Sequence, residues 1–256
     1  MPEHTSLLTL VLAYVKETLS DNAHHIGDSL IGNEPANWQS FEPIGASLCV
    51  VLIILVLTLM VRRGLRQLDE AVIPEEHLTI RTFFEAFLGY FYDLSKSVMG
   101  PERAKRYYPI VGTSAIFVFV SNSLALIPGM PIATSSLNIT LGCAAVVFVL
   151  FNAYGLAANG LLYIKHVAGP AWYLWWLTFP VEVISLCVRP VTLSVRLMLN
   201  MSVDHLVLGI IMGLVAVLVP IPVMLLGCVI IVVQTLVFTL LTIIYIALAT
   251  ENMAHH

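Results

Sequence analysis

Charged residues are scarce in this chain. Only 11% of its 256 residues are charged, against roughly a quarter in ordinary soluble domains. The formal net charge is −4, whereas a nucleic-acid partner requires a strongly basic surface. The composition therefore argues against a soluble domain, and no nucleic-acid partner is expected.

Motifs for catalysis and metal binding are missing too. The four cysteines, Cys49, Cys143, Cys187 and Cys228, lie in apolar runs without CxxC or Cys/His spacing, which favours packing over a disulfide or a metal site. The eight histidines form no HExxH motif or histidine box, and there is no GxxxxGK[ST] loop. We therefore expect no metal, no cofactor, no nucleotide site and no catalytic activity.

Long apolar runs dominate what is present. Hydrophobic residues make up 59% of the chain, and the mean hydropathy is +0.91. Runs such as 44–61 and 114–129 approach the ~20 residues that a helix needs to cross the hydrocarbon. Their apolar residues are contiguous rather than alternating, which predicts helices and not a barrel. The expected fold class is an all-α integral membrane protein.

The apolar runs predict about five membrane helices. Residues 1–43 are polar and acidic, without the pattern of a signal peptide, and 44–256 is expected to form a single membrane domain. The aromatic segment 80–100 is interrupted by charges, which predicts an amphipathic helix at the interface. The membrane helices are expected at about 44–61, 107–127, 135–164, 171–218 and 221–250.

Basic residues set the expected orientation. Nine of the twelve fall within 62–106 or at Lys165, and five crossings place all nine on one side. The positive-inside rule makes that side the cytoplasm, with residues 1–43 facing outward. An acidic outward segment and an uncleaved N-terminus favour a bacterial plasma membrane over a mitochondrial inner membrane.

The last two apolar segments are too long to stand upright. Residues 173–218 would form a rod of ~70 Å and 221–250 one of ~45 Å, against a hydrocarbon core of ~30 Å. Pro180 and Pro190 can kink the longer segment. The simplest solution is a strongly tilted hairpin, which is suited to lying along a cylindrical partner.

A line of polar side chains runs through the first of these long segments. Glu182, Arg189 and Arg196 recur at intervals of seven, so they share one helix face. A lone arginine at the bilayer centre costs ~3 kcal/mol on insertion scales, which argues for a partner or a water-filled cavity. Arg196 is central and about four turns from Glu182, so we expect a functional role for it. Arg189, next to Pro190, is expected to be structural, and a structural role for Glu182 stays open.

Four more polar residues extend this line. Asn200 lies one turn beyond Arg196, and Gln234 lies on the last helix. These amides cannot take up or release a proton, but they can order water or bind a guanidinium. Asp204 and His205 lie a further turn outward. A buried histidine is more often a packing residue, but next to Asp204 its near-neutral titration suits it to relay protons.

The residues around this line resemble a known family. The stretches "PVEVISLCVRPVTLSVRLMLNMSVDHL" (180–206) and "VQTLVFTLLTIIYIALA" (233–249) resemble the two signature helices of subunit a of F-type ATP synthases. The segments "NSLALIP", "SLNITL" and "YIKHVAGP" match as well. The resemblance covers nearly the whole chain from residue 44 onward.

The resemblance implies a proton-conducting stator subunit with two offset half-channels against a rotating c-ring. It implies c-ring subunits, peripheral-stalk b subunits, other ATP synthase subunits and the lipid bilayer as partners. Arg196 matches the essential arginine that faces the ring carboxylates and separates the two half-channels. Gln234 matches the glutamine packed against that arginine. Asn200 and His205 match the outward half-channel, and Glu182 matches the acid of the cytoplasmic one.

Two positions depart from the family pattern. Gly227 stands where relatives often carry a His or Glu that works with the residue at the His205 position, and Ala125 replaces an aspartate of some relatives. We therefore expect Asp204, beside His205, to supply the missing acid. The pair favours H⁺ over Na⁺, although in this family the c subunit largely decides the ion.

Two other classes of protein stay open at this point. A secondary ion-coupled transporter could use an intramembrane Arg/Asp/His site, but the sequence has no inverted repeat and no matching pair of broken helices. An intramembrane metalloprotease or desaturase would need histidine spacings that are missing. Co-purification separates the classes, since a transporter runs alone or as a homo-oligomer and a stator subunit travels with a c-ring.

Overall fold

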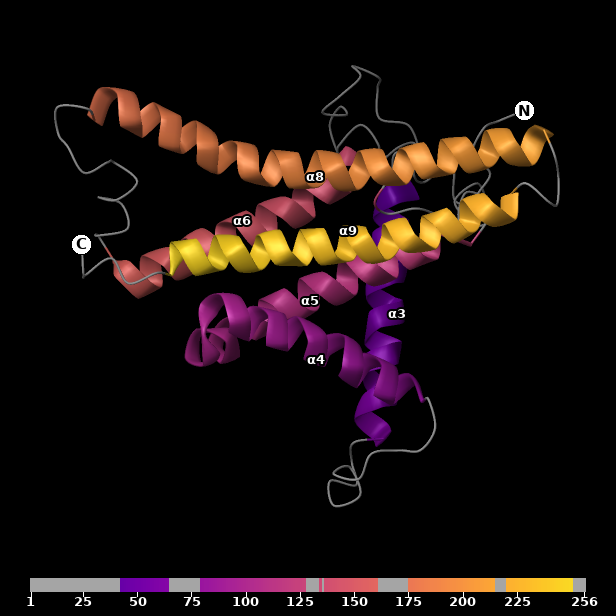
Figure 1. Cartoon of the computed structure of the whole chain (residues 1–256), viewed down its shortest axis with the longest axis horizontal. Coiled ribbons are helices and arrows are strands. Elements are labelled where there is room, and N and C mark those ends of the chain that lie inside the picture. The colour runs from indigo at the N-terminus through magenta and orange to yellow at the C-terminus, as the bar shows by residue number, and fades with distance from the viewer. Residues whose placement is uncertain are drawn as a thin grey trace, which may run out of the picture.

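The computed structural model describes residues 42–64, 79–127, 134, 136–160, 175–214 and 220–250. Six long helices occupy these ranges (Figure 1): α3 (Glu42–Gly64), α4 (Ile80–Met99), α5 (Pro101–Ala125), α6 (Leu137–Asn159), α8 (Trp175–Leu214) and α9 (Pro220–Ala249). The described residues contain no β-strand, so the predicted all-α class is confirmed. The predicted polar segment 1–43 lies outside the described residues except for its last two, which belong to α3.

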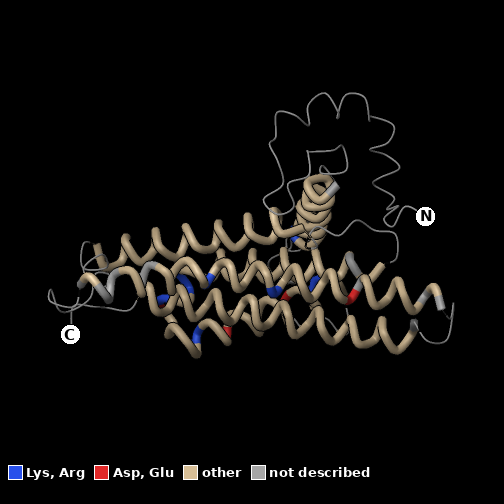
Figure 2. The backbone as a smooth tube through the Cα atoms, turned by 90° about the horizontal axis from the view of Figure 1, so that it is seen from above, with Lys and Arg blue, Asp and Glu red and all other residues tan. Residues whose placement is uncertain are grey.

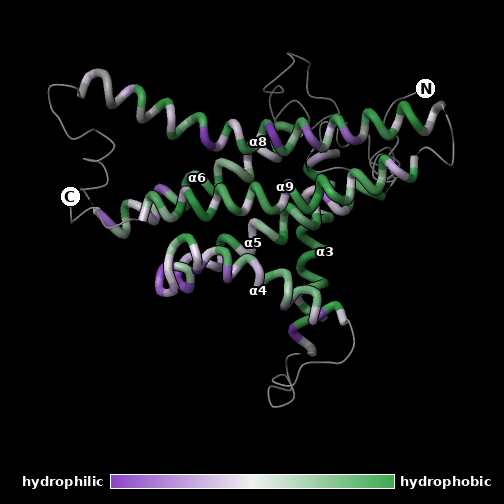
Figure 3. The backbone as a smooth tube through the Cα atoms, in the orientation of Figure 1, coloured by the Kyte–Doolittle hydropathy of each residue, from purple (hydrophilic) through white to green (hydrophobic). Residues whose placement is uncertain are grey.

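Five of these helices are long and apolar enough to cross a membrane, namely α3, α5, α6, α8 and α9. The remaining helix, α4, is amphipathic: Phe91, Ser95 and Met99 are buried on one side, while Asp93 and Lys96 are exposed on the other. These features confirm a multi-pass membrane protein with five candidate spans and one amphipathic helix that is not among them. Figure 3 shows that α3 and α9 are hydrophobic along most of their length.

The helix α5 begins six residues earlier than predicted. It starts at Pro101, directly after Gly100, whose φ of 82° lies in the left-handed region that glycine tolerates. Proline suits the first turn of a helix because no N–H is needed there. The charged residues that follow therefore extend the membrane helix instead of forming a loop, and α4 and α5 fold into a hairpin.

Aromatic contacts hold α4 against α5. The Phe87 ring lies 4.9 Å from the Phe119 ring and 5.0 Å from the Phe91 ring, between centroids. The Tyr108 hydroxyl donates a hydrogen bond of 2.6 Å to the carbonyl of Leu88. Packing of this kind adds geometric preference to the burial of large apolar rings, so the amphipathic helix has a defined place beside α5.

The core lies where α5, α6, α8 and α9 meet. Its buried members include Val118, Phe151, Leu197 and Phe238, one from each of these helices. Buried threonines of α9 donate to their own helix: the hydroxyls of Thr235, Thr239 and Thr242 bond carbonyls four residues earlier. Polar groups in a dry interior need such partners. Because each hydroxyl proton is used within α9, these threonines donate no hydrogen bond to α8.

The helices α8 and α9 are long, as the sequence predicted. With 40 and 30 residues, the two helices span about 60 and 45 Å, more than the ~30 Å hydrocarbon core, so both must tilt. Pro180 and Pro190 lie inside α8 without ending it. Figure 1 shows α8 as one bowed helix alongside α9, with both crossing α3. Figure 2 shows how few charged positions interrupt these helices.

Candidate functional site

Among the described residues, two polar side-chain contacts join α8 to α9. The Nδ2 of Asn200 donates a hydrogen bond of 2.8 Å to Oε1 of Gln234. The guanidinium carbon of Arg189 lies 5.3 Å from the centroid of the Tyr245 ring. Eleven residues separate the two contacts on each helix, so both belong to a single antiparallel register. This register places specific residues of the two helices opposite one another.

Arg196 lies between these two contacts on α8. It follows Arg189 by seven residues and precedes Asn200 by four, and its side chain is exposed in the isolated chain. Within the described part of the protein, no hydrogen bond or ion pair joins Arg196 to another residue. An uncompensated cation on a membrane helix is costly. The arrangement therefore calls for a counter-charge from outside this chain.

The apolar neighbours of Arg196 divide between two faces of α8. Leu193, Leu197 and Met201 are buried against the rest of the bundle. Leu199 and Val203 are exposed, and at 100° per residue they lie on the same side of the helix as Arg196. Arg196 thus stands at the border of an open, apolar face, where a second membrane protein could reach it.

Gln234 is buried, and its hydrogen bond goes to Asn200. The resemblance implied that this glutamine packs against Arg196; among the described residues, no hydrogen bond joins the two. Asn200 lies one turn from Arg196, so the amide pair borders the arginine without neutralising it. Glu182 and His205 lie in α8, but their side chains are outside the described part of the structure, and their roles stay predictions.

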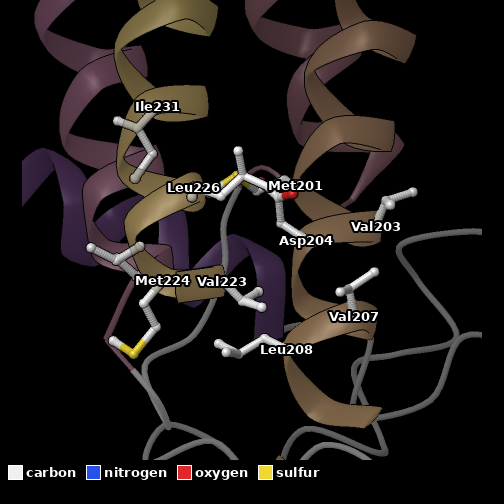
Figure 4. Close-up of a pocket in the computed structure, with 11 residues that line it drawn as sticks. Met201, Val203, Asp204, Val207, Leu208, Val223, Met224, Leu226 and Ile231 are labelled. Atoms are coloured by element: carbon white, nitrogen blue, oxygen red, sulfur yellow. The ribbon is translucent and has the colours of Figure 1, made fainter. Parts of the chain in front are cut away.

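Asp204 lines a pocket between α8 and α9 with a volume of about 240 Å³. The carboxylate projects from α8 toward α9 (Figure 4). Gly227 of α9 and Leu126, which directly follows α5, line the same pocket, and most of its other lining is aliphatic or methionine. The structure thus brings together Asp204 and Gly227, which the sequence had linked only through the family pattern. Ala125, the other departure, precedes Leu126, and its side chain is outside the described part.

The glycine at 227 adds no side chain to this pocket. A Cβ placed there would lie 3.2 Å from Cδ1 of Leu126, slightly closer than ordinary contact. A histidine or glutamate at 227 would therefore enter the pocket and displace Leu126. The space that such a side chain would fill is available to the Asp204 carboxylate and to water.

A buried polar cluster on α5 was not assigned a role from the sequence. Asn122 and Ser121 are both fully buried at 0% exposed, and Nδ2 of Asn122 and Oγ of Ser121 have no hydrogen-bond partner among the described residues. The Thr134 hydroxyl donates to Oδ1 of Asn122 at 3.3 Å. Asn122 lies one turn before Leu126, about 6 Å along the helix. A signal existed: an asparagine inside an apolar span is costly unless its amide finds hydrogen-bond partners.

These groups leave no metal ligand set in the part of the chain that is described, where no three His, Cys, Asp or Glu side chains cluster. The site instead offers a cation without a partner among the described residues, an amide paired with Gln234 and a half-buried carboxylate, at intervals of four residues along α8. A cation, an amide and a carboxylate in such a series can order water and exchange protons with it.

Comparison with known proteins agrees with this geometry. A family model described as "ATP synthase A chain" matches residues 45–247. A protein of Sorangium cellulosum named "ATP synthase subunit a" is 58% identical over 256 residues, covering 100% of both chains. A protein of Geobacter sulfurreducens with the same name is 35% identical over 211 residues, covering 82% of this chain and 88% of its own. The chain therefore belongs to the family of subunit a of the F-type ATP synthases.

Proposed function

We propose that this protein is the proton-conducting stator subunit of a bacterial F-type ATP synthase. Two offset half-channels meet near Arg196 against a rotating c-ring, and ion flow through them drives rotation. As a member of its family the chain is a component of the complex, with other ATP synthase subunits as partners; the proposal leaves ATP chemistry to those subunits. The observation that carries it is Arg196, exposed on an apolar face of α8 and without a hydrogen-bond or ion-pair partner among the described residues.

The c-ring is the partner that this face fits. Exposed aliphatic residues follow Arg196 along α8, among them Leu199, Val203 and Leu206. A ring carboxylate that passes Arg196 would meet a fixed positive charge, which favours its ionised form. The carboxylate must then release its proton on one side and take up another on the far side. Arg196 thereby separates the two paths and prevents a leak without rotation.

The outward path runs through the Asp204 pocket. Its volume of about 240 Å³ is many times the ~10–15 Å³ that one water needs, so the pocket has room for several waters. Asp204 and His205 exchange protons with this water, and Asn200 orders it one turn nearer to Arg196. Asp204 supplies the acid that Gly227 lacks. The Nδ2 of Asn122, which has no hydrogen-bond partner among the described residues, lies about one turn from the pocket wall at Leu126 and extends the polar lining toward α5.

The inward path starts from Glu182, which lies fourteen residues before Arg196 on α8, or about 21 Å along the helix. It opens toward the side that carries most of the basic residues, the cytoplasm of a bacterial plasma membrane. Peripheral-stalk b subunits hold the protein against rotation. The translocated ion is H⁺, because the Asp204 and His205 pair suits proton relay.

Proton pumping by inverted membrane vesicles tests the proposal. ATP-driven acidification is measured with Arg196→Ala, with ATP hydrolysis recorded in parallel, and Leu199→Ala on the same face serves as the matched control. We expect Arg196→Ala to abolish acidification in assembled complexes that still hydrolyse ATP, and Leu199→Ala to retain it. Retained pumping in Arg196→Ala would overturn the proposal. Purification of the chain without a c-ring would favour a secondary transporter instead.

A further inference from the structure

Arg189 occupies an unusual setting for a membrane arginine. Its side chain is half-buried, and no carboxylate partner is found for it among the described residues. Instead its guanidinium carbon lies 5.3 Å from the Tyr245 ring centroid, within the ~6 Å range of a cation–π contact. The Tyr245 ring lies 5.9 Å from that of Phe151, which is buried on α6. The contact therefore joins α6, α8 and α9.

The position of the Arg189–Tyr245 contact shows how it relates to the other polar contact between α8 and α9. Together with the Asn200 and Gln234 bond, it belongs to one antiparallel register, with Arg196 between the two. Among the described side chains, these are the polar contacts that join α8 to α9. Elsewhere the two helices meet through aliphatic residues, for which lipid tails are an equivalent environment. Aliphatic packing alone specifies the register weakly, because a slip of one turn exchanges one leucine for another.

The backbone next to Arg189 gives a reason why α8 needs a contact with α9 at this point. Pro190 follows Arg189 inside α8, and a proline removes one hydrogen bond of the helix ladder. Helices bend most readily at such a position. A bend next to Arg189 would move every residue beyond it, including Arg196, relative to α9.

We propose that Arg189 and Tyr245 form the second of two ties that set the height and rotation of Arg196 against α9. This rests on the proposed role of Arg196 as the barrier between half-channels. Arg189 is then a positioning residue and not a member of the proton path. The ring face of Tyr245, not its hydroxyl, makes the tie.

Four variants test this chemistry: Tyr245→Phe, Tyr245→Leu, Arg189→Met and the double variant Arg189→Met with Tyr245→Leu. ATP-driven acidification per ATP hydrolysed is measured in inverted vesicles that contain the assembled complex. We expect Tyr245→Phe to match the unmodified protein. In Tyr245→Leu and in Arg189→Met, acidification per ATP hydrolysed should fall about threefold to tenfold. In the double variant it should fall no further than in either single variant. Equal loss in Tyr245→Phe and Tyr245→Leu would overturn the proposal, as would additive losses.

The register can be measured without reference to the role of Arg196. The antiparallel pairing sets Leu193 opposite Leu241, so the pair Leu193→Cys and Leu241→Cys should form a disulfide faster than Leu193→Cys with Val237→Cys. The four native cysteines are first replaced by alanine. Tyr245→Leu should lower the ratio of these two rates by about threefold or more, and Tyr245→Phe should leave it unchanged. An unchanged ratio in Tyr245→Leu would overturn the tie, whatever Arg196→Ala does to pumping.

Discussion

The side-chain amide of Asn200 is bound to that of Gln234 across the hairpin, at 2.8 Å between Nδ2 and Oε1. The bond joins residues 34 positions apart and lies one turn from Arg196. It therefore couples the barrier on α8 to the neighbouring helix, and it fixes which oxygen and which nitrogen remain free for water.

Removing one partner of this hydrogen bond should reduce proton pumping more than exchanging the two amide residues. Asn200→Leu leaves the buried Oε1 of Gln234 unpaired, a loss of about 1–3 kcal/mol. We expect acidification by vesicles to fall about tenfold. The exchange Asn200→Gln with Gln234→Asn, which keeps one donor and one acceptor, should recover more than half of the pumping. If the exchange were as impaired as Asn200→Leu, the bond would not be what matters.

Asp204 should be required for outward proton access. Asp204→Asn keeps the shape of the side chain and removes its ability to ionise, so pumping should fall about tenfold or more, while Asp204→Glu should retain a measurable rate. Val203→Ala, on the neighbouring exposed face, is the matched control and should pump normally. Undiminished acidification by Asp204→Asn would refute the assignment of the missing acid to this residue.

The size of the residue at 227 should control the pocket. Gly227→Ala adds a Cβ at 3.2 Å from Leu126 Cδ1, which a small shift relieves, so pumping should stay within about twofold. Gly227→Leu fills the space beside Asp204 and should reduce acidification strongly. Leu126→Ala should partly restore the rate of Gly227→Leu. A normal rate in Gly227→Leu would show that protons do not use this pocket.

Replacement of Asn122 should reduce proton pumping without reducing the stability of the complex. Asn122→Leu removes the buried Nδ2 that has no partner among the described residues, a cost of about 1–3 kcal/mol, but it also removes the acceptor of the long Thr134 hydrogen bond, so the two effects largely offset. Heat-induced dissociation of the purified complex should shift little or upward, while proton pumping declines. If both stability and pumping fell together, the side chain would be structural.

The open face of α8 should be the ring-facing one. Val203 on α8 is 53% exposed and Val149 on α6 is 62% exposed, so the two sites are matched in accessibility. Val203→Trp should obstruct the c-ring and lower its co-purification with this chain. Val149→Trp, which we expect to face lipid, should assemble normally. If Val149→Trp lowered co-purification and Val203→Trp did not, the c-ring would lie against α6 instead of α8.

Much of the fold could be predicted because a bilayer imposes strong local constraints. A spanning helix must be apolar over a known length, so the five spans, the amphipathic α4 and the excess length of α8 and α9 were visible in the residues alone. The start of α5 was placed six residues too late because the apolar run begins after the charged residues, whereas the helix begins at the tight corner of Gly100 and Pro101. Arg196 stood out because few positions in such a chain carry charge.

The sequence by itself therefore determined the class of protein, the tilted hairpin and the polar residues along α8, since each follows from composition or from spacing within one helix. Only the tertiary structure decided the partners: Gln234 for Asn200, Tyr245 for Arg189, and one pocket shared by Asp204 and Gly227. These contacts depend on the register and rotation of one helix against another. Apolar periodicity does not encode that register, because a helix displaced by one turn presents a nearly identical surface.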